Sequence, residues 1–422
     1  DIRKKNRLGG CSMNDTFSLL QKYTGISKYS QSEVITPQWV VSDMVDLLPQ
    51  EIFNPDATFF DPAVKSGRFL IEIYNRLMAS DLMKQAFPNE QDCHKHIIEK
   101  QLFGFATSPT AATVVRKTLY DDPLSTGNIR FTSDKLTNGL IQGAFSNMKF
   151  DVVIGNPPYN NDIYLDFVTL GHQLSTQYAI MITPAKWQAK SGDKNEKFRK
   201  DIVPYMSKIV YYPDCGDIFD IGDVGGVSYY CIKKVESNDC TIISKCYSNK
   251  VINNKYAKRR VNFRLACYCD TILEKLGNET KLKIDKEYRQ YNYMITTPPA
   301  IGGAKGSKSF LLGNSGMCQC IKLGKTYTKD DALMLPNHYS ILCSDDTEEK
   351  FNSKVSYIYT RFIRFLVFIG LTTQSILTEE TWRFVPDPGA FDHIFTDDEL
   401  YKKYGLTPEE INIIESVIKE RK

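Results

Sequence analysis

The sequence predicts an α/β fold in which helices cover both faces of a mostly parallel sheet. Over roughly the first 240 residues, short continuous apolar runs alternate with stretches of helical periodicity. Strands buried on both faces read as continuous apolar runs, which is typical of parallel sheets. With 42% hydrophobic and 24% charged residues and a net charge of +3, the 422-residue chain has a globular composition and room for two domains.

The elements are expected in a regular order. Thr58-Phe59-Phe60 is a short strand that leads into a turn, and a helix over 69–78 follows, with Phe69, Ile73 and Leu77 on one face. Continuous apolar runs predict further strands at 101–106, 150–155, 178–183, 208–212 and 227–233. The densest apolar run, 362–371, is too short to span a membrane and predicts a buried helix.

The pattern changes near residue 250, and we place a domain boundary near residue 245. Residues 250–308 hold 13 Lys and Arg against 5 Asp and Glu, a net charge of +8, interleaved with tyrosines. Such a stretch suits a nucleic-acid surface, with an ordinary solvated face as the alternative. Residues 387–422 are acidic, with 5 basic against 9 acidic residues.

The cysteines predict neither a disulfide framework nor a metal centre. The 11 cysteines are scattered, without a CxxC pair, which favours free thiols in a reducing cytoplasm. Cys93, His94 and His96 come closest to a zinc cluster but lack a second matching pair, so no metal is expected. No secretory leader is visible, and residues 1–30 are interpreted as an N-terminal extension, with a tag as one source and Met13 as one native start.

The first motif with chemical content is Asp61-Pro62-Ala63-Val64-Lys65-Ser66-Gly67-Arg68-Phe69-Leu70, between a strand and a helix. Small residues let backbone amides approach a ligand, and a helix start offers a partial positive charge. Such a turn belongs at the carboxyl edge of a parallel sheet, where cofactors bind. It is neither a phosphate loop nor a GxGxxG fingerprint, and a purely structural turn is the alternative.

The second motif is Asn156-Pro157-Pro158-Tyr159, directly after the predicted strand at 150–155. Two prolines cannot extend a central strand, so they stiffen the loop and leave the Pro157 carbonyl able to accept a hydrogen bond. Asn156 adds a side-chain oxygen and Tyr159 a flat ring. Two acceptors beside a stacking face form a receptor for a planar amino group, whereas a plain turn is the alternative.

These motifs, in this order over residues 30–235, resemble S-adenosylmethionine-dependent DNA adenine-N6 methyltransferases, in which the cofactor motif precedes NPPY and a target-recognition domain follows. The resemblance implies a Rossmann-like methyltransferase domain over 31–245, with a mostly parallel seven-stranded sheet. It also implies a mixed α+β DNA target-recognition domain over 246–422.

The resemblance assigns roles to individual residues. Catalysis falls to Asn156, Pro157, Pro158 and Tyr159. Cofactor binding falls to Thr36, Pro37, Asp61, Pro62, Ala63, Ser66, Gly67, Phe105, Ala106 and Asp134. Phe219 is expected to stack on the extruded base opposite Tyr159, and Lys258, Arg259 and Arg260 are expected to bind the DNA substrate.

Two departures from the family pattern concern the cofactor. Lys65 stands where the family usually has glycine. The strand ending at Ala106 also lacks the Asp or Glu that, in the family, hydrogen-bonds the ribose hydroxyls of the cofactor. In place of the acid, Phe105 is expected to pack on the adenine ring of the cofactor, and Thr107 or Ser108 to contact its ribose. Loss of a charge-assisted hydrogen bond weakens binding by about 1 to 3 kcal/mol.

The resemblance implies methyl transfer from S-adenosylmethionine to the N6 amine of a flipped adenine, as the modification part of a restriction-modification system. The implied partners are double-stranded DNA and a restriction nuclease, without a membrane. Three alternatives stay open: an RNA adenine methyltransferase, a protein glutamine methyltransferase, and a weakly active or non-catalytic DNA-specificity module.

Overall fold

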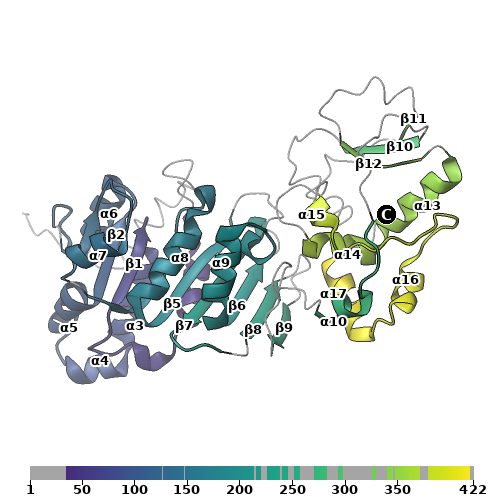
Figure 1. Cartoon of the computed structure of the whole chain (residues 1–422). Helices are drawn as coiled ribbons and strands as arrows, with labels where there is room; N and C mark the ends of the chain where they lie inside the picture. The colour runs from purple at the N-terminus through teal and green to yellow at the C-terminus, as the bar shows by residue number, and fades with distance from the viewer. Residues whose placement is uncertain are drawn as a thin grey trace, which may run out of the picture. The chain divides into compact units, whose positions relative to one another are not determined.

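The computed structural model divides by its contacts into two compact units, Asp1–Met181 and Ile182–Lys422, with the boundary inside strand β5. Figure 1 labels the helices and strands. The structure describes residues 35–125, 127–146, 148–212, 215–219, 226–237, 240–245, 251–256, 270–282, 293–297, 326–328, 340–345, 347–370 and 379–418. The predicted extension over 1–30 and the predicted DNA-binding residues Lys258, Arg259 and Arg260 lie outside them. The predicted domain boundary near residue 245 remains a prediction.

The first unit is built on parallel strands. They are β1 (Phe59–Val64), β2 (Leu102–Ala106), β3 (Ile129–Phe131), β4 (Phe150–Gly155) and β5 (Ser175–Pro184). Their order is β3-β2-β1-β4-β5, and each neighbouring pair is parallel. β1 and β2 are buried along their whole length, as the apolar sequence of β2 predicts; β1 is buried even though it contains Asp61. The predicted α/β class with a mostly parallel sheet is confirmed.

β1 runs further than the sequence predicts. The expected strand ends at Phe60, and pairing with β4 does end there, at Phe60↔Val153. Pairing with β2 continues past an irregularity between Asp61 and Val64 and ends at Val64↔Ala106. A proline inside a central strand is tolerated at such a bulge, because its missing N–H takes no part in the ladder there.

Helices connect these strands and pack on them. They are α2 (Gln38–Val45), α3 (Arg68–Ala79), α4 (Asp81–Ala86), α5 (Glu90–His96), α6 (Pro109–Tyr120), α7 (Asn138–Ala144) and α8 (Ile163–Leu174), with short turns η1 (Gln50–Ile52), η2 (Ile97–Gln101) and η3 (Asn160–Asp162). α3 packs on β1, α6 on β2 and β3, and α8 on β4. The predicted helix over 69–78 is confirmed, since α3 buries Phe69, Ile73 and Leu77.

An aromatic cluster fills the core beneath these strands. Phe60 stacks on Phe150 with ring centroids 4.5 Å apart, and Phe145 meets Phe60 edge-on at 6.0 Å. Phe103 and Phe105 complete the cluster, each edge-on to Phe145. Buried aromatic side chains in offset or edge-on pairs contribute strongly to core stability, so β1, β2 and β4 are held in a fixed relation.

In the second unit the strand order continues from β5 as β7-β6-β8-β9. The strands are β6 (Met206–Tyr212), β7 (Val227–Lys233), β8 (Cys240–Lys245) and β9 (Val251–Tyr256). β7 is antiparallel to β6, β8 is parallel to β6, and β9 is antiparallel to β8. The prediction of seven strands falls short of the nine that the structure describes in this sheet, because β8 and β9 add to it beyond β6.

Helix α9 (Asp193–Ile202) and the short turns η4 (Ala185–Gln188), η5 (Val203–Tyr205) and η6 (Cys215–Asp217) accompany these strands. Trp187 in η4 is fully buried and lies edge-on to Phe198 of α9 and Tyr230 of β7. Tyr230 in turn shares a hydrogen bond of 3.0 Å with Thr183. These contacts hold η4 and α9 against β7.

The chain after β9 is mixed α+β, as predicted. β10 (Tyr293–Thr297) lies between β11 (Thr326–Thr328) and β12 (Ser340–Asp345) and is antiparallel to both. The helices are α10 (Asp270–Leu276), α13 (Glu348–Tyr359), α14 (Arg361–Gly370), α15 (Glu379–Trp382), α16 (Asp397–Lys403) and α17 (Pro408–Val417). The predicted buried helix is α14, which is buried from Phe362 to Gly370. No helix among the described residues is long and apolar enough to cross a membrane.

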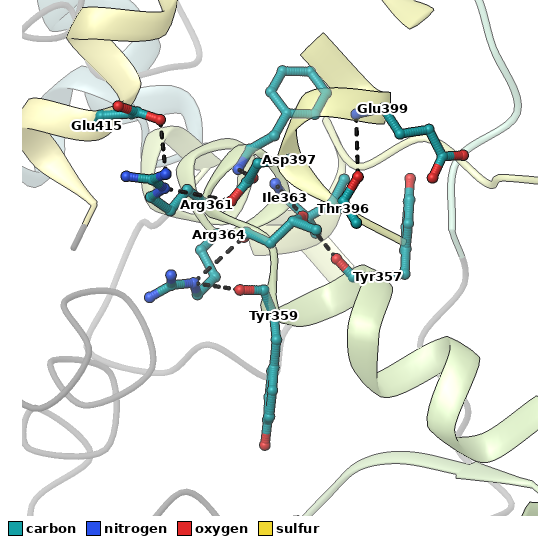
Figure 2. A network of polar contacts seen from close by, with 11 residues as sticks. Tyr357, Tyr359, Arg361, Ile363, Arg364, Thr396, Asp397, Glu399 and Glu415 are labelled. Carbon is teal, nitrogen blue, oxygen red and sulfur yellow. Dashed lines mark hydrogen bonds and ion pairs between the residues drawn. The ribbon is translucent and has the colours of Figure 1, made fainter. Parts of the chain in front are cut away.

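Polar contacts hold the start of α14 (Figure 2). Asp397 accepts a hydrogen bond of 3.0 Å from the Phe362 amide and pairs with Arg361 at 3.4 Å, and Arg361 also pairs with Glu415 at 2.8 Å. Arg364, although only 1% exposed, donates from Nε to the Tyr359 carbonyl at 3.0 Å. α14 is therefore tied to α16 and α17 by charge as well as by apolar packing.

His94 and His96 make hydrogen bonds within the fold, and Cys93 is a buried free thiol. His94 Nδ1 shares a hydrogen bond of 2.9 Å with the Tyr74 hydroxyl, and His96 Nε2 lies 2.8 Å from the Pro55 carbonyl oxygen. Within the described part of the chain, no group of three or more His, Cys, Asp or Glu could hold a metal ion.

Candidate cofactor and catalytic site

The candidate site begins where β1 and β4 end beside each other. Gly155, the last residue of β4, lies so close to β1 that a Cβ there would be 2.7 Å from Asp61 Oδ1. Glycine therefore lets the Asp61 carboxylate sit directly against the β4 backbone, one residue before the NPPY motif. The two motifs, 95 residues apart in sequence, meet at this edge as the parallel-sheet interpretation predicts.

Asp61 is a buried carboxyl with few partners to offset its burial. It is 2% exposed, and its Oδ1 accepts a hydrogen bond of 2.8 Å from the Ala63 amide. Burial raises the pKa of Asp61 to about 7, although the Ala63 hydrogen bond and the nearby charge of Lys65 act in the opposite direction. A carboxyl poised near neutral pH at a cavity wall is typical of functional sites.

The turn after β1 requires glycine at position 67 and is tied to the segment before α2. Gly67 adopts a left-handed conformation with φ of +77° at the N-cap of α3, and a side chain there would come within 2.8 Å of Val115 Cγ2. Arg68 Nη1 donates to the Thr36 carbonyl at 2.8 Å. This bond ties the start of α3 to the segment before α2, so residues from two distant parts of the sequence converge.

Asn156 joins the same cluster. It is 2% exposed, and its Nδ2 donates a hydrogen bond of 3.0 Å to Thr36 Oγ1. This bond fixes the plane of the amide and directs Oδ1 away from Thr36. A narrow cavity touches all of these groups, and its lining residues are Thr36, Asp61, Ala63, Lys65, Ser66, Gly67, Arg68, Phe69 and Asn156.

A larger cavity of about 320 Å³ lies along the ends of β1, β2 and β3. It is lined by Pro62, Ala63, Lys65, Phe105, Ala106, Thr107, Thr132, Ser133, Asp134, Lys135, Leu136, Pro158, Ile163 and Phe167. A mostly apolar cavity of this size with a few polar groups is typical of a small-molecule site. Ala63 and Lys65 line both cavities, so the two adjoin at the turn after β1.

The comparison with known families decides the class of this site. Residues 14–212 match the family model of the N-6 DNA methylases. Over these residues, just under half of the chain, the sequence is similar to the N-6 DNA methylases, and we call this stretch the methylase domain. The predicted family and enzyme class, DNA adenine-N6 methyltransferase, are confirmed.

Individual relatives of the methylase domain are distant. A Mycoplasma pneumoniae protein described as an uncharacterized adenine-specific methylase is 26% identical over 324 residues, covering 56% of this chain and 72% of the relative. A modification subunit of a putative type I restriction enzyme from Vibrio vulnificus YJ016 is 15% identical, with a TM-score of 0.40, covering 56% of this chain and 53% of that one.

A type I restriction-modification methyltransferase subunit from Streptococcus thermophilus is 15% identical, with a TM-score of 0.42, covering 58% of this chain and 55% of that one. The chain thus spans about half the length of these two solved subunits. The family assignment rests on the family match and the Mycoplasma relative.

The NPPY loop of the methylase domain contributes to both cavities, with Asn156 in the narrow one and Pro158 in the larger one. Pro157 is buried, and the half-buried Tyr159 ring lies edge-on to Tyr164 at 6.3 Å. Asn161 and Asp162 follow with φ of 51° and 57°. Two successive left-handed residues are costly outside glycine, and here they turn the chain from the motif into α8.

The two cavities gather most of the predicted cofactor residues. Thr36, Asp61, Pro62, Ala63, Ser66, Gly67, Phe105, Ala106 and Asp134 all line one or both of them. Pro37 is the N-cap of α2 and lines neither cavity. The geometry brings these residues together, and their roles remain predictions.

The two residues offered as substitutes for the missing ribose acid differ in position. Thr107 lines the larger cavity, and its hydroxyl donates to the Val64 carbonyl at 3.3 Å. Ser108 instead caps α6, where its Oγ accepts from the Ala111 amide at 3.1 Å. Phe105 lines the cavity as expected, although it also packs against Phe60 and Phe145.

Some wall residues were not predicted. Ile163 and Phe167 of α8 line the larger cavity, and Arg68 lines the narrow one. The i, i+4 spacing of Ile163 and Phe167 directly after NPPY is a readable signal for a helix face turned to the motif. Phe219, the predicted stacking residue in the second unit, is 3% exposed, and its amide donates to the Cys215 carbonyl at 2.7 Å.

Proposed function

We propose that this protein transfers a methyl group from S-adenosylmethionine to the N6 amine of adenine in double-stranded DNA. The observation that carries the proposal is the convergence of Asn156, Asp61 and Gly67 on one narrow cavity. Methyl transfer needs acceptors for the target amine next to the cofactor's reactive end, and this cavity joins the NPPY motif to the cofactor turn. The family match of residues 14–212 supports the same chemistry.

The described residues fit S-adenosylmethionine. Gly67 lines the narrow cavity at the start of α3, where backbone amides and the helix N-terminus favour a negatively charged group. The buried Asp61 carboxyl suits the ammonium of the cofactor's amino-acid end. The larger cavity, with Phe105, Pro158 and Phe167 in its wall, suits the nucleoside.

In the proposed mechanism, Asn156 Oδ1 and the Pro157 carbonyl accept hydrogen bonds from the two amino hydrogens of adenine. The amine is a poor nucleophile because its lone pair is delocalised into the ring. The two acceptors draw it toward tetrahedral geometry and stabilise the positive charge that develops on nitrogen. The hydrogen bond from Asn156 to Thr36 preorganises the amide. The cofactor supplies the activated methyl group when bound.

Adenine inside a duplex cannot reach this corner, so the proposal includes extrusion of the target base. Tyr159 supplies a half-buried ring beside the catalytic loop, on which the extruded base would stack. Lys and Arg of residues 250–308 would hold DNA phosphates, and loops of that region would read base edges. A role as the modification part of a restriction-modification system, with a nuclease partner, belongs to the same proposal.

The first test is Asn156→Ala, assayed by transfer of a radiolabelled methyl group to double-stranded DNA. Loss of one transition-state acceptor predicts a fall in rate of about 10²- to 10³-fold, with S-adenosylhomocysteine binding weakened far less. Asn138→Ala, at an exposed position of α7, is the matched control and keeps the wild-type rate. A near-wild-type rate of methyl transfer by Asn156→Ala would contradict the proposed mechanism.

The same assay separates the alternative substrates. Wild-type protein is offered double-stranded DNA, RNA and protein side by side, and label is expected in DNA adenine alone. Label confined to RNA or to protein overturns the substrate proposal. Absence of S-adenosylmethionine binding by calorimetry would favour the non-catalytic specificity module.

A further inference from the structure

Lys65 occupies an unusual place for a lysine. It is only 9% exposed, and it lines both the narrow cavity and the larger one. Lysine side chains are almost never buried unless a partner or a ligand compensates for the lost hydration. Lys65 stands in the wall shared by the two adjoining cavities, where a ligand that occupies them would meet its side chain.

The two cavities differ in chemistry, and Lys65 lies where they adjoin. The narrow cavity is lined by polar and charged groups such as Asp61, Ser66 and Asn156, whereas Phe105, Ile163 and Phe167 give the larger one an apolar wall. The narrow cavity has a volume of only about 10 Å³ against about 320 Å³ for the larger one, so a ligand that occupies both has one apolar or aromatic end and a small charged group. The adenosine and amino-acid ends of S-adenosylmethionine match this division.

The narrow cavity presents one acidic and one basic side chain, which match the ammonium and the carboxylate of a zwitterion. Asp61 presents a buried carboxyl, and the charge of Lys65 is close enough to favour ionisation of that carboxyl. An α-amino acid carries one ammonium and one carboxylate on the same carbon. Opposite charges at adjacent walls can therefore hold both groups at once, each by a charge-assisted hydrogen bond.

We infer that Lys65 binds the carboxylate of the cofactor's amino-acid end, while Asp61 takes its ammonium. Arg68, the other cation of the narrow cavity, donates to the Thr36 carbonyl through Nη1. Lys135, the other lysine of the larger cavity, is exposed. Of these three cations, Lys65 is the one that lines both cavities. The inference rests on the proposed use of S-adenosylmethionine and adds the residue that selects its carboxylate.

Two ligands that differ only in this carboxylate provide the test. S-adenosylhomocysteine and 5′-deoxy-5′-(3-aminopropylthio)adenosine share the nucleoside, the thioether and the amine, and only the first has the carboxylate. Calorimetry measures the affinity of each for the wild-type chain, for Lys65→Met and for Lys65→Arg. Lys100→Met, an exposed position in the same unit, controls for the loss of one positive charge.

The wild-type chain and Lys100→Met are expected to prefer S-adenosylhomocysteine by about 10-fold or more, the ratio that a charged hydrogen bond supplies. In Lys65→Met this ratio falls to about 2-fold or less, because only the carboxylate ligand loses affinity. Lys65→Arg keeps most of the preference. Binding of the decarboxylated ligand within about 2-fold of wild type also shows that Lys65→Met is folded.

Two other results overturn the inference. In one, Lys65→Met keeps the wild-type ratio, and in the other it weakens both ligands equally, which would mean that Lys65 shapes the cavity without binding the carboxylate. If the wild-type chain binds neither S-adenosylhomocysteine nor S-adenosylmethionine, the proposed function itself has failed, which is a distinguishable outcome.

Discussion

At the scale of single residues, Asp61 makes the stability of the protein depend on pH in an unusual direction. Its folded pKa of about 7 lies above the ordinary value of 3.8, because burial disfavours the charged form. The folded state therefore holds a proton that the unfolded chain releases. The resulting stabilisation is complete below the unfolded pKa and is lost as the pH rises toward 7.

We expect the free energy of unfolding of the wild-type chain without ligand to fall between pH 5 and pH 8 more steeply than that of Asp61→Asn. Between pH 5 and pH 8 the wild-type chain should lose about 3 kcal/mol more of its unfolding free energy than Asp61→Asn does. The folded pKa lies about two units above pH 5, and each unit corresponds to 1.36 kcal/mol. Urea unfolding at the two pH values measures it. All other titrating groups are common to both proteins, so parallel profiles would contradict the prediction.

The sequence predicted the residues of the site better than their contacts. Asp61, Gly67 and Asn156 belong to short motifs whose chemistry is readable from residue type and order. The hydrogen bond from Asn156 to Thr36 joins positions 120 residues apart, which no local pattern reveals. Burial of Lys65 was also beyond prediction, because lysine is ordinarily exposed and only the adjoining cavities show its surroundings.

At the scale of elements, the start of α14 depends on one carboxylate from another helix. Asp397, the first residue of α16, accepts from the Phe362 amide at 3.0 Å and pairs with Arg361 (Figure 2). A helix start leaves its first amides without intrahelical partners, so an acceptor there stabilises the helix. α14 is buried along nearly its whole length, which makes an unmet amide costly.

Asp397→Ala is expected to lower the free energy of unfolding by about 1 to 3 kcal/mol, the sum of a lost cap and a partly exposed ion pair. Glu415→Ala, which removes the other ion pair of Arg361 but no amide contact, is the matched control and costs less than about 1 kcal/mol. Chemical unfolding curves of the two variants measure the difference. Equal losses would show that the amide contact adds nothing.

Long, uniformly apolar elements were predictable, and short or edge elements were not. β2, β4, β7 and α14 agree with the predicted spans to within a residue. β3 has only three residues, of which Ile129 alone is buried, so it shows no apolar run. β8 lies at the very end of the predicted domain and β9 follows it, where strands and helices no longer alternate. The two strands pair with each other in an antiparallel ladder.

At the scale of the whole molecule, charge is distributed unevenly along a nearly neutral chain. The net charge is +3, yet residues 250–308 carry +8 and residues 387–422 carry −4. Polyanion binding depends on local charge density, since each neutralised phosphate releases counterions. The chain as a whole is therefore expected to bind DNA through one basic region in a salt-dependent way, although its total charge is small.

This expectation yields a quantitative test. Fluorescence anisotropy gives the affinity for double-stranded DNA between 50 and 200 mM salt, and the logarithm of affinity should fall linearly with the logarithm of salt concentration. Replacing Arg259 and Arg260 together by Ala should reduce the slope by up to about 2, because each phosphate contact contributes about 0.9. Replacing Lys402 and Lys403, exposed residues of the acidic region, removes the same charge and should leave the slope unchanged. Equal slopes for the two double variants would show that net charge, rather than the basic region, governs binding. An affinity that does not change with salt would contradict a DNA-binding surface in this region.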